Sequence, residues 1–161
     1  MPTDTISHEV LIAGAKEIFE TMIFLDLQVV EGVEESSDCE TVLGTITFTG
    51  SIEGCLGISC GQDCAQTIAA SMLGMDSGED LSAQDVHDAM GEVCNMVMGC
   101  VKASLADDFG DIQVSIPTVV SGREIAHDMG DHNESVLSRV RIADQYCTQL
   151  SLQWRHAERG R

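Results

Sequence analysis

The spacing of apolar residues predicts the helices of this chain. A first helix is expected over about 7–24, because its apolar residues recur at steps of four and three and so share one face. Those residues are Leu11, Ala15, Ile18, Met22 and Leu25. A second helix is expected over 65–73, and a third from Ser82, which forms a capping box with Asp85, to about 107. The glycines that end the second and third helices are Gly74 and Gly110.

Alternating apolar and polar residues predict strands before and after the two later helices. The strands are expected at 27–30, 41–49, 55–60, 112–116, 135–142 and 146–154. Turn residues join the second to the third, and the fifth to the sixth, as hairpins. Pro117 ends the fourth, because proline cannot donate a hydrogen bond to a sheet. The order αβββααβββ predicts an α+β sandwich in which an antiparallel-rich sheet packs against long helices.

Composition limits the class of partner. The 161 residues fit a single domain, 1–161, with a core over about 7–154 and a tail over 155–161. With 8 Lys and Arg against 27 Asp and Glu, the formal net charge is -19, which excludes nucleic acid and an anionic membrane surface as partners. The chain has no apolar run of about 20 residues and no basic leader before an apolar segment. We therefore expect a cytoplasmic protein without a membrane partner.

The cysteines do not follow a disulfide or zinc pattern. There are 7, an odd number, and none form a Cys-x-x-Cys pair. Cys60 and Cys64 lie one helical turn apart with Cys55 nearby, so they are either small core residues, which we expect, or part of a metal or redox site. His127 and His132 could bind a divalent ion, but a solvated loop is the simpler interpretation. No metal site is predicted.

The third helix carries a polar stripe on an otherwise apolar or small surface. Its members fall on one line at about 100° per residue: they are Asp88, Glu92, Asn95, Gly99 and Lys102, with Gly91 at the margin. Interior glycines destabilise a helix by about 1 kcal/mol each relative to alanine, so close approach of another backbone is the expected reason for them. The stripe is either a solvated face or a site in which the Glu92 carboxylate binds a cation and the Asn95 carboxamide positions a water molecule.

The residues around this stripe resemble a known family. The run 88–99, with Glu92 and Asn95 spaced as Glu-x-x-Asn, is similar to the active-site helix of the CheC/CheX/FliY chemotaxis phosphatases. Further segments resemble CheX-type sequences in the same order: they are 19–22, 69–74 and 115–122. The resemblance covers about 12–154 and implies a CheC-like sandwich.

What the resemblance implies is a phosphatase that hydrolyses the phospho-aspartate of a CheY-like response regulator. Asn95 would orient the attacking water, and Glu92 would pair with the active-site lysine of the regulator. The regulator would hold the phosphoryl group and a Mg²⁺ ion, so this chain would bind no cofactor of its own. The other stripe residues would contact the regulator, whose loops the glycines would let approach: Asp88, Gly91, Gly99 and Lys102. CheX-type proteins pair through their sheets, which implies a homodimer.

The first helix is expected to lack a second site. CheC-type proteins have two such motifs in a duplicated fold, whereas CheX-type proteins have one. When the first helix is aligned with the third by sliding it 75 positions along the sequence, Glu17 falls under Glu92 but Glu20 falls under Asn95. The first helix therefore lacks the carboxamide of the motif. Two other functions stay open. One is a CheX-like adaptor that binds a response regulator or flagellar partner without hydrolysis, and the other is a purely structural oligomerisation domain.

Overall fold

The computed structural model describes residues 6–31, 40–76, 80–123 and 134–157. The helices are α1 (His8–Ile18), which continues as the π-helical turn η1 (Phe19–Ile23), then α2 (Gln62–Met72) and α3 (Ala83–Phe109). The strands are β1 (Leu27–Val29), β2 (Thr41–Thr49), β3 (Ile52–Gly61), β4 (Gln113–Val114), β5 (Thr118–Gly122), β6 (Glu134–Ile142) and β7 (Tyr146–His156).

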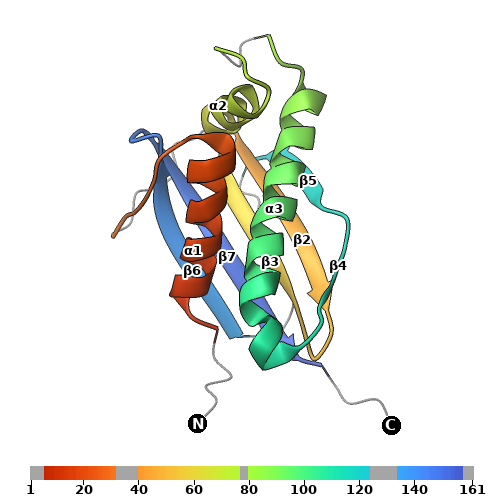
Figure 1. Cartoon of the computed structure of the whole chain (residues 1–161). Coiled ribbons are helices and arrows are strands. Elements are labelled where there is room, and N and C mark those ends of the chain that lie inside the picture. Colours follow the sequence, from red (N-terminus) through yellow and green to blue (C-terminus); the bar gives the residue numbers. More distant parts are fainter. Residues whose placement is uncertain (1–5, 32–39, 77–79, 124–133, 158–161) are drawn as a thin grey trace.

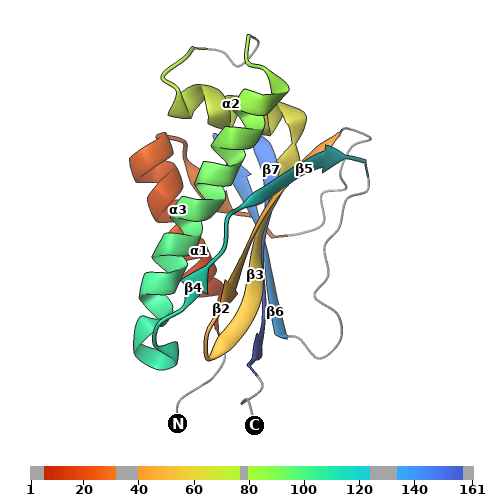
Figure 2. The same cartoon turned by 90° about the vertical axis from the view of Figure 1, so that its right-hand side faces the viewer.

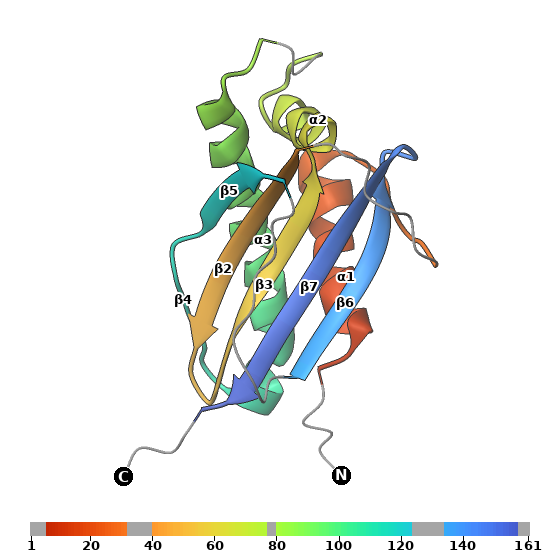
Figure 3. The ribbon, with the colours of Figure 1, turned by 180° about the vertical axis from the view of Figure 1, so that it is seen from behind.

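The strands form one antiparallel sheet that carries its helices on one face. The sheet has seven strands in the order β1-β6-β7-β3-β2-β4, and β5 also pairs with β2. Figure 1 shows α1 and α3 side by side in front of the sheet, with α2 across one end. The edge view in Figure 2 separates the two layers, and Figure 3 shows the opposite face of the sheet. The predicted α+β sandwich with an antiparallel sheet is confirmed.

The first helix differs from the prediction in its last turn. Leu11, Ala15 and Ile18 are buried as expected, but the side chain of Met22 is 57% exposed. The cause is η1, because a π-helical turn holds more residues than an α-helical turn and so rotates the residues that follow. Phe19 and Ile23 enter the core instead of Met22.

The segment after α3 also differs from the prediction. The strand expected over 112–116 shrinks to the two residues of β4, and Ile116 is 88% exposed. A further strand that the sequence pattern did not predict, β5, follows Pro117 and pairs with β2 from Thr45↔Thr118 to Thr41↔Gly122. Proline therefore interrupts the segment rather than ending it, and both pieces pair with the same strand.

Close contacts at two glycines fix where α3 lies. A methyl group at Gly44 of β2 would come within 2.5 Å of the Cys94 sulfur, so the helix lies directly on this strand. A methyl group at Gly14 of α1 would lie 3.2 Å from Val101 Cγ2, so the two long helices also pack closely. At the start of α3 the predicted capping box is confirmed, since the Asp85 backbone N–H donates to Ser82 Oγ and the Ser82 N–H donates to the Asp85 carboxylate.

Candidate functional site

The polar stripe lies on the outer face of α3. Asp88, Glu92, Asn95 and Gly99 are exposed, whereas residues on the inner face of the same helix are fully buried. In Figure 1, α3 runs between α1 on one side and the β4–β5 segment on the other, so these two elements flank the helix that carries the stripe. The predicted exposure of the stripe follows from the helical period, because α3 is one unbroken helix from Ala83 to Phe109.

The two residues of the Glu-x-x-Asn motif present free polar groups. Among the described residues, neither Glu92 nor Asn95 has a hydrogen-bond or ion-pair partner for its side chain. The two residues are separated by three positions, so their side chains project from neighbouring points of one helix face. A carboxylate and a carboxamide held in this way are available to a ligand, and neither contributes to the fold through a polar contact that would be lost on binding.

The other stripe residues differ in their availability. The carboxylate of Asp88 accepts a hydrogen bond from Gln84 Nε2 at 2.6 Å. Lys102 is partly exposed, and its Nζ lies 3.6 Å from Asp111 Oδ1. Both are surface contacts of the kind that a partner can exchange at little cost in free energy.

The two stripe glycines have different surroundings. Gly91 is buried, and a methyl group there would lie 3.5 Å from Pro117 Cγ and 3.7 Å from Val119 Cγ2. The close approach predicted at this glycine thus comes from the chain's own β4–β5 segment, which covers the position that we expected a partner to contact. Gly99 is exposed, and a methyl group there would meet no neighbouring group within 4 Å. Gly99 therefore keeps the open position that the sequence predicts.

The β4–β5 segment is tied to the side of α3 by one further contact. His87 Nε2 lies 2.7 Å from the Ser121 hydroxyl of β5. Sequence reasoning did not find this pair, because the two residues are 34 positions apart and β5 was not predicted. The contact links β5 to the helix that carries the stripe.

An open groove borders the stripe on its other side. The groove has a volume of about 560 Å³, and Gly99 belongs to both the groove and the stripe. We call it the η1–α3 groove, and its main lining residues are Glu17, Ile18, Met22, Met96, Gly99 and Cys100. The sequence pattern missed it because Met22 was assigned to the core. An exposed apolar residue within a helical period is visible only once the π-helical turn is known.

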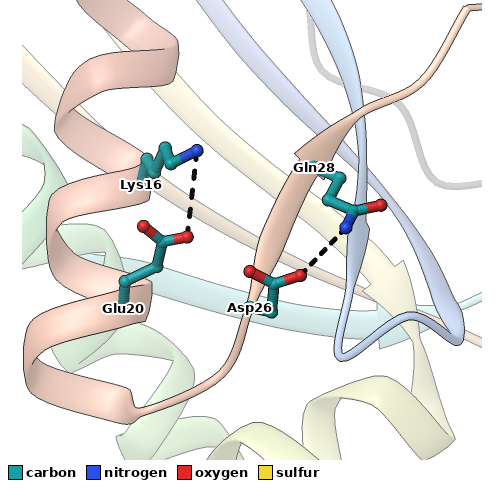
Figure 4. A network of polar contacts seen from close by, with 4 residues as sticks. All are labelled: Lys16, Glu20, Asp26 and Gln28. Carbon is teal, nitrogen blue, oxygen red and sulfur yellow. Dashed lines mark hydrogen bonds and ion pairs between the residues drawn. The ribbon is translucent and has the colours of Figure 1, made fainter.

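The corresponding face of the first helix holds no second motif. Glu20, which the 75-position slide sets under Asn95, lies 3.9 Å from Lys16 in an ion pair on one helical turn. Figure 4 shows this pair, with Asp26 accepting a hydrogen bond from Gln28 Nε2 close by. The same 75-position slide sets Phe24 under Gly99, and Phe24 is bulky and 80% exposed. These residues offer no carboxamide that could act as Asn95 does.

The described cysteines are free thiols, four of them buried, with Cys100 half-buried and Cys147 exposed. Cys55, Cys60, Cys64 and Cys94 are buried, and burial raises the pKa of Cys94 to about 12. A hydrogen bond with Cys64 and burial hold the pKa of Cys60 well above its usual range. Thiols with a raised pKa stay protonated at neutral pH, which suits packing, whereas the hydrogen bond with Cys60 lowers the pKa of Cys64.

The described ranges hold no group of three or more His, Cys, Asp or Glu side chains placed to bind a metal ion. The candidates His127 and His132 lie outside the described residues. None of the described helices is both long and apolar enough to cross a membrane.

Several solved structures with a similar fold bear the names CheX or CheC-like. The CheX protein from Vibrio vulnificus has a TM-score of 0.76 and 22% identity, with 92% of this chain and 95% of that chain covered. A CheC-like superfamily protein from Shewanella sp. PV-4 has a TM-score of 0.75 and 22% identity, with 93% and 99% covered. A chain of the CheX-CheY-BeF3-Mg²⁺ complex from Borrelia burgdorferi has a TM-score of 0.71 and 16% identity, with 92% and 97% covered. The fold is therefore that of the CheC- and CheX-like proteins.

The family model of the chemotaxis phosphatase CheX matches residues 42–139, a stretch that includes all of α3 and the polar stripe. The chain belongs to the CheX family. No curated protein sequence matches it significantly.

Proposed function

We propose that this chain is a phosphatase that hydrolyses the phospho-aspartate of a CheY-like response regulator. The observation that carries the proposal is the pair Glu92 and Asn95, which is exposed, lacks polar partners among the described residues and lies on a rigid helix. Membership of the CheX family supports the reaction class, and the complex of a similar CheX with CheY, BeF3 and Mg²⁺ supports the kind of partner. We propose that the protein acts in the cytoplasm as a homodimer.

The roles of the two residues follow from the chemistry of phosphoryl transfer. The reaction needs a water held in line with the phosphorus and neutralisation of spreading negative charge, and little covalent help. The Asn95 carboxamide can both accept from and donate to one water, so it orients the nucleophile. The Glu92 carboxylate pairs with the active-site lysine of the regulator, which sets the register of docking. The phosphorylated regulator would hold the Mg²⁺ ion, which would supply charge neutralisation there.

The experiment that tests this proposal is phosphate release from a CheY-type regulator phosphorylated with a small-molecule donor in the presence of Mg²⁺. Phosphatase activity predicts faster release when the protein is added in substoichiometric amounts. Binding to the phosphorylated regulator without faster release would instead identify an adaptor. The absence of both would mean that the regulator tested is not the partner or that the phosphatase assignment is wrong, which leaves an adaptor for a flagellar partner or a structural oligomerisation domain.

Replacing Glu92 by alanine is expected to weaken docking more than it slows the chemical step. A hydrogen bond between charged groups contributes about 1.5 to 3 kcal/mol, and about 1.4 kcal/mol corresponds to a tenfold change in an equilibrium constant. The half-saturating regulator concentration should therefore rise at least about tenfold, with a smaller change in the rate at saturation. Asp108→Ala is the control, because it removes an exposed acid from the last turn of the same helix. Equal half-saturation for wild type and Glu92→Ala would contradict the assigned role.

Replacing Glu20 by glutamine is expected to leave the phosphatase rate unchanged. Glu20 occupies the position on the first helix that corresponds to Asn95, but its carboxylate takes part in a surface ion pair with Lys16. Surface pairs of this kind contribute about 0 to 1 kcal/mol, so the fold should also be unaffected. Steady-state phosphate release and thermal unfolding measure the two effects. A large loss of rate in a folded variant would show that the protein has a second site.

A further inference from the structure

The η1–α3 groove lies next to the proposed catalytic pair. Met96 and Gly99 line the groove, and they follow Asn95 by one and four residues on the same helix. Gly99 is one helical turn from Asn95 on the exposed stripe. A protein that covers Asn95 and Glu92 therefore also covers at least the edge of this groove.

Two local features open the groove. Where Gly14 meets Val101 the helices are in close contact, since a methyl group on Gly14 would lie only 3.2 Å from Val101 Cγ2. Further along, Gly99 contributes no side chain, and a methyl group there would meet nothing within 4 Å. On the opposite wall, η1 rotates Met22 out of the core to line the groove. The groove is therefore open because Gly99 has no side chain and because η1 turns Met22 outward.

The groove and the end of η1 expose apolar surface that the fold does not use. The side chain of Met22 is 57% exposed, and that of Phe24 is 80% exposed. Phe24 also has a left-handed backbone, with φ of 63°, which is unfavourable for a bulky residue. Methionine side chains adapt to the shape of a partner and are common on protein-binding surfaces. Met22 and Met96 thus offer the groove adaptable apolar contacts beside the proposed catalytic pair.

The charge around the groove indicates what binds there. The described helices carry nine Asp and Glu but only two Lys, and both lysines lie within 4 Å of a carboxylate. Glu17 at the groove wall accepts a hydrogen bond from the Cys100 thiol at 3.7 Å and adds a negative charge there. Such an acidic surface attracts positively charged groups and repels acidic ones. The complementary occupant is apolar with a positive charge beside it.

We propose that the η1–α3 groove receives an apolar side chain of the response regulator that is flanked by a lysine or arginine. This contact orients the regulator so that its phosphoryl group meets Asn95. The inference rests on the proposed function for the identity of the occupant, and it assigns a recognition role to residues that take no part in hydrolysis.

The test measures binding of a CheY-type regulator loaded with beryllofluoride and Mg²⁺, so that affinity is read without turnover. Gly99→Leu fills the groove from a position with free space, and Met22→Ser removes its apolar wall. We expect the Kd to rise at least about tenfold for Gly99→Leu and about fivefold for Met22→Ser. Because Met22→Ser blocks nothing, a loss in both variants cannot come from steric obstruction alone. Leu137→Ser is the control, since Leu137 is 51% exposed on β6 and lies outside the groove.

The outcomes separate this inference from the proposed function. Wild-type affinity in Gly99→Leu and Met22→Ser, with phosphate release by the wild type intact, would overturn the groove contact alone. If the two variants sediment differently from the wild type but bind the regulator with unchanged affinity, the groove serves self-association, and this result would also overturn the proposed contact with the regulator. Weaker binding of both variants with no phosphate release by the wild type would support the groove contact and reject the phosphatase. No binding of the regulator to the wild type would reject both.

Discussion

Replacing Asn95 by alanine is expected to slow phosphate release from the phosphorylated regulator at least about tenfold at saturation. That factor corresponds to about 1.4 kcal/mol of lost transition-state stabilisation. The reason is that alanine can neither accept from nor donate to the attacking water, whereas the carboxamide does both. Asn95 is exposed and lacks a polar partner among the described residues, so its loss should leave the fold intact, and the higher helix propensity of alanine should keep the stability at or slightly above that of wild type. Single-turnover release and thermal unfolding measure the two effects.

The control for this variant is Gln84→Ala. Gln84 is an exposed carboxamide on the same helix and donates to Asp88 at 2.6 Å, but it lies about three turns before Asn95. Its replacement should leave the rate at saturation within about twofold of wild type, because Gln84 contacts the proposed docking residue Asp88 and lies too far from Asn95 to reach the attacking water. A folded Asn95→Ala protein with full activity would defeat the proposed mechanism, whatever the behaviour of Gln84→Ala.

Replacing Gly54 by alanine is expected to reduce the free energy of unfolding by about 3 kcal/mol, at the upper end of the usual cost of overpacking. Gly54 is buried on β3, where it pairs with Phe48 of β2 and Trp154 of β7. A methyl group there would collide with the backbone oxygen of Gln153 and approach Phe48 Cζ to 2.5 Å. Neither atom can yield easily, because one belongs to a paired strand and the other to a fully buried ring. Urea unfolding measures the loss.

The same substitution at Gly99 is the matched control and should have the opposite sign. Gly99 is exposed within α3 and has free space around it, so alanine adds helix propensity without a clash. The expected gain is up to about 1 kcal/mol. If Gly54→Ala unfolds at the same urea concentration as wild type, the sheet is more adaptable at its centre than these contacts imply.

The polar stripe could be predicted from the sequence because it depends on one helix. The Ser82 capping box sets the start of α3, and the helical period then determines that Glu92 and Asn95 share a face. The capping box and the helical period each depend on residues that lie within four positions of each other. The exposure of the two side chains in the structure agrees with that prediction.

The surroundings of the stripe could not be predicted in the same way. Gly91 is covered by Pro117 and Val119, which lie more than 20 positions further along the chain in a segment where β5 was not expected. Met22 lines the groove because Phe19 and Ile23 occupy the core in its place. Which of these residues is buried depends on packing against the sheet and α3, which are distant in sequence. Apolar spacing alone assigned Met22 to the buried face.

The sequence by itself therefore determined the helices, the hairpins, the acidic charge and the Glu-x-x-Asn pair, because each depends on local spacing or on composition. Only the tertiary structure decided which side of the stripe is closed and which is open. The β4–β5 segment covers Gly91, while Gly99 and the π-helical turn leave the groove beside Asn95 free. The physical reason is that these features come from contacts between residues far apart in the chain, whose arrangement is set by how the core packs.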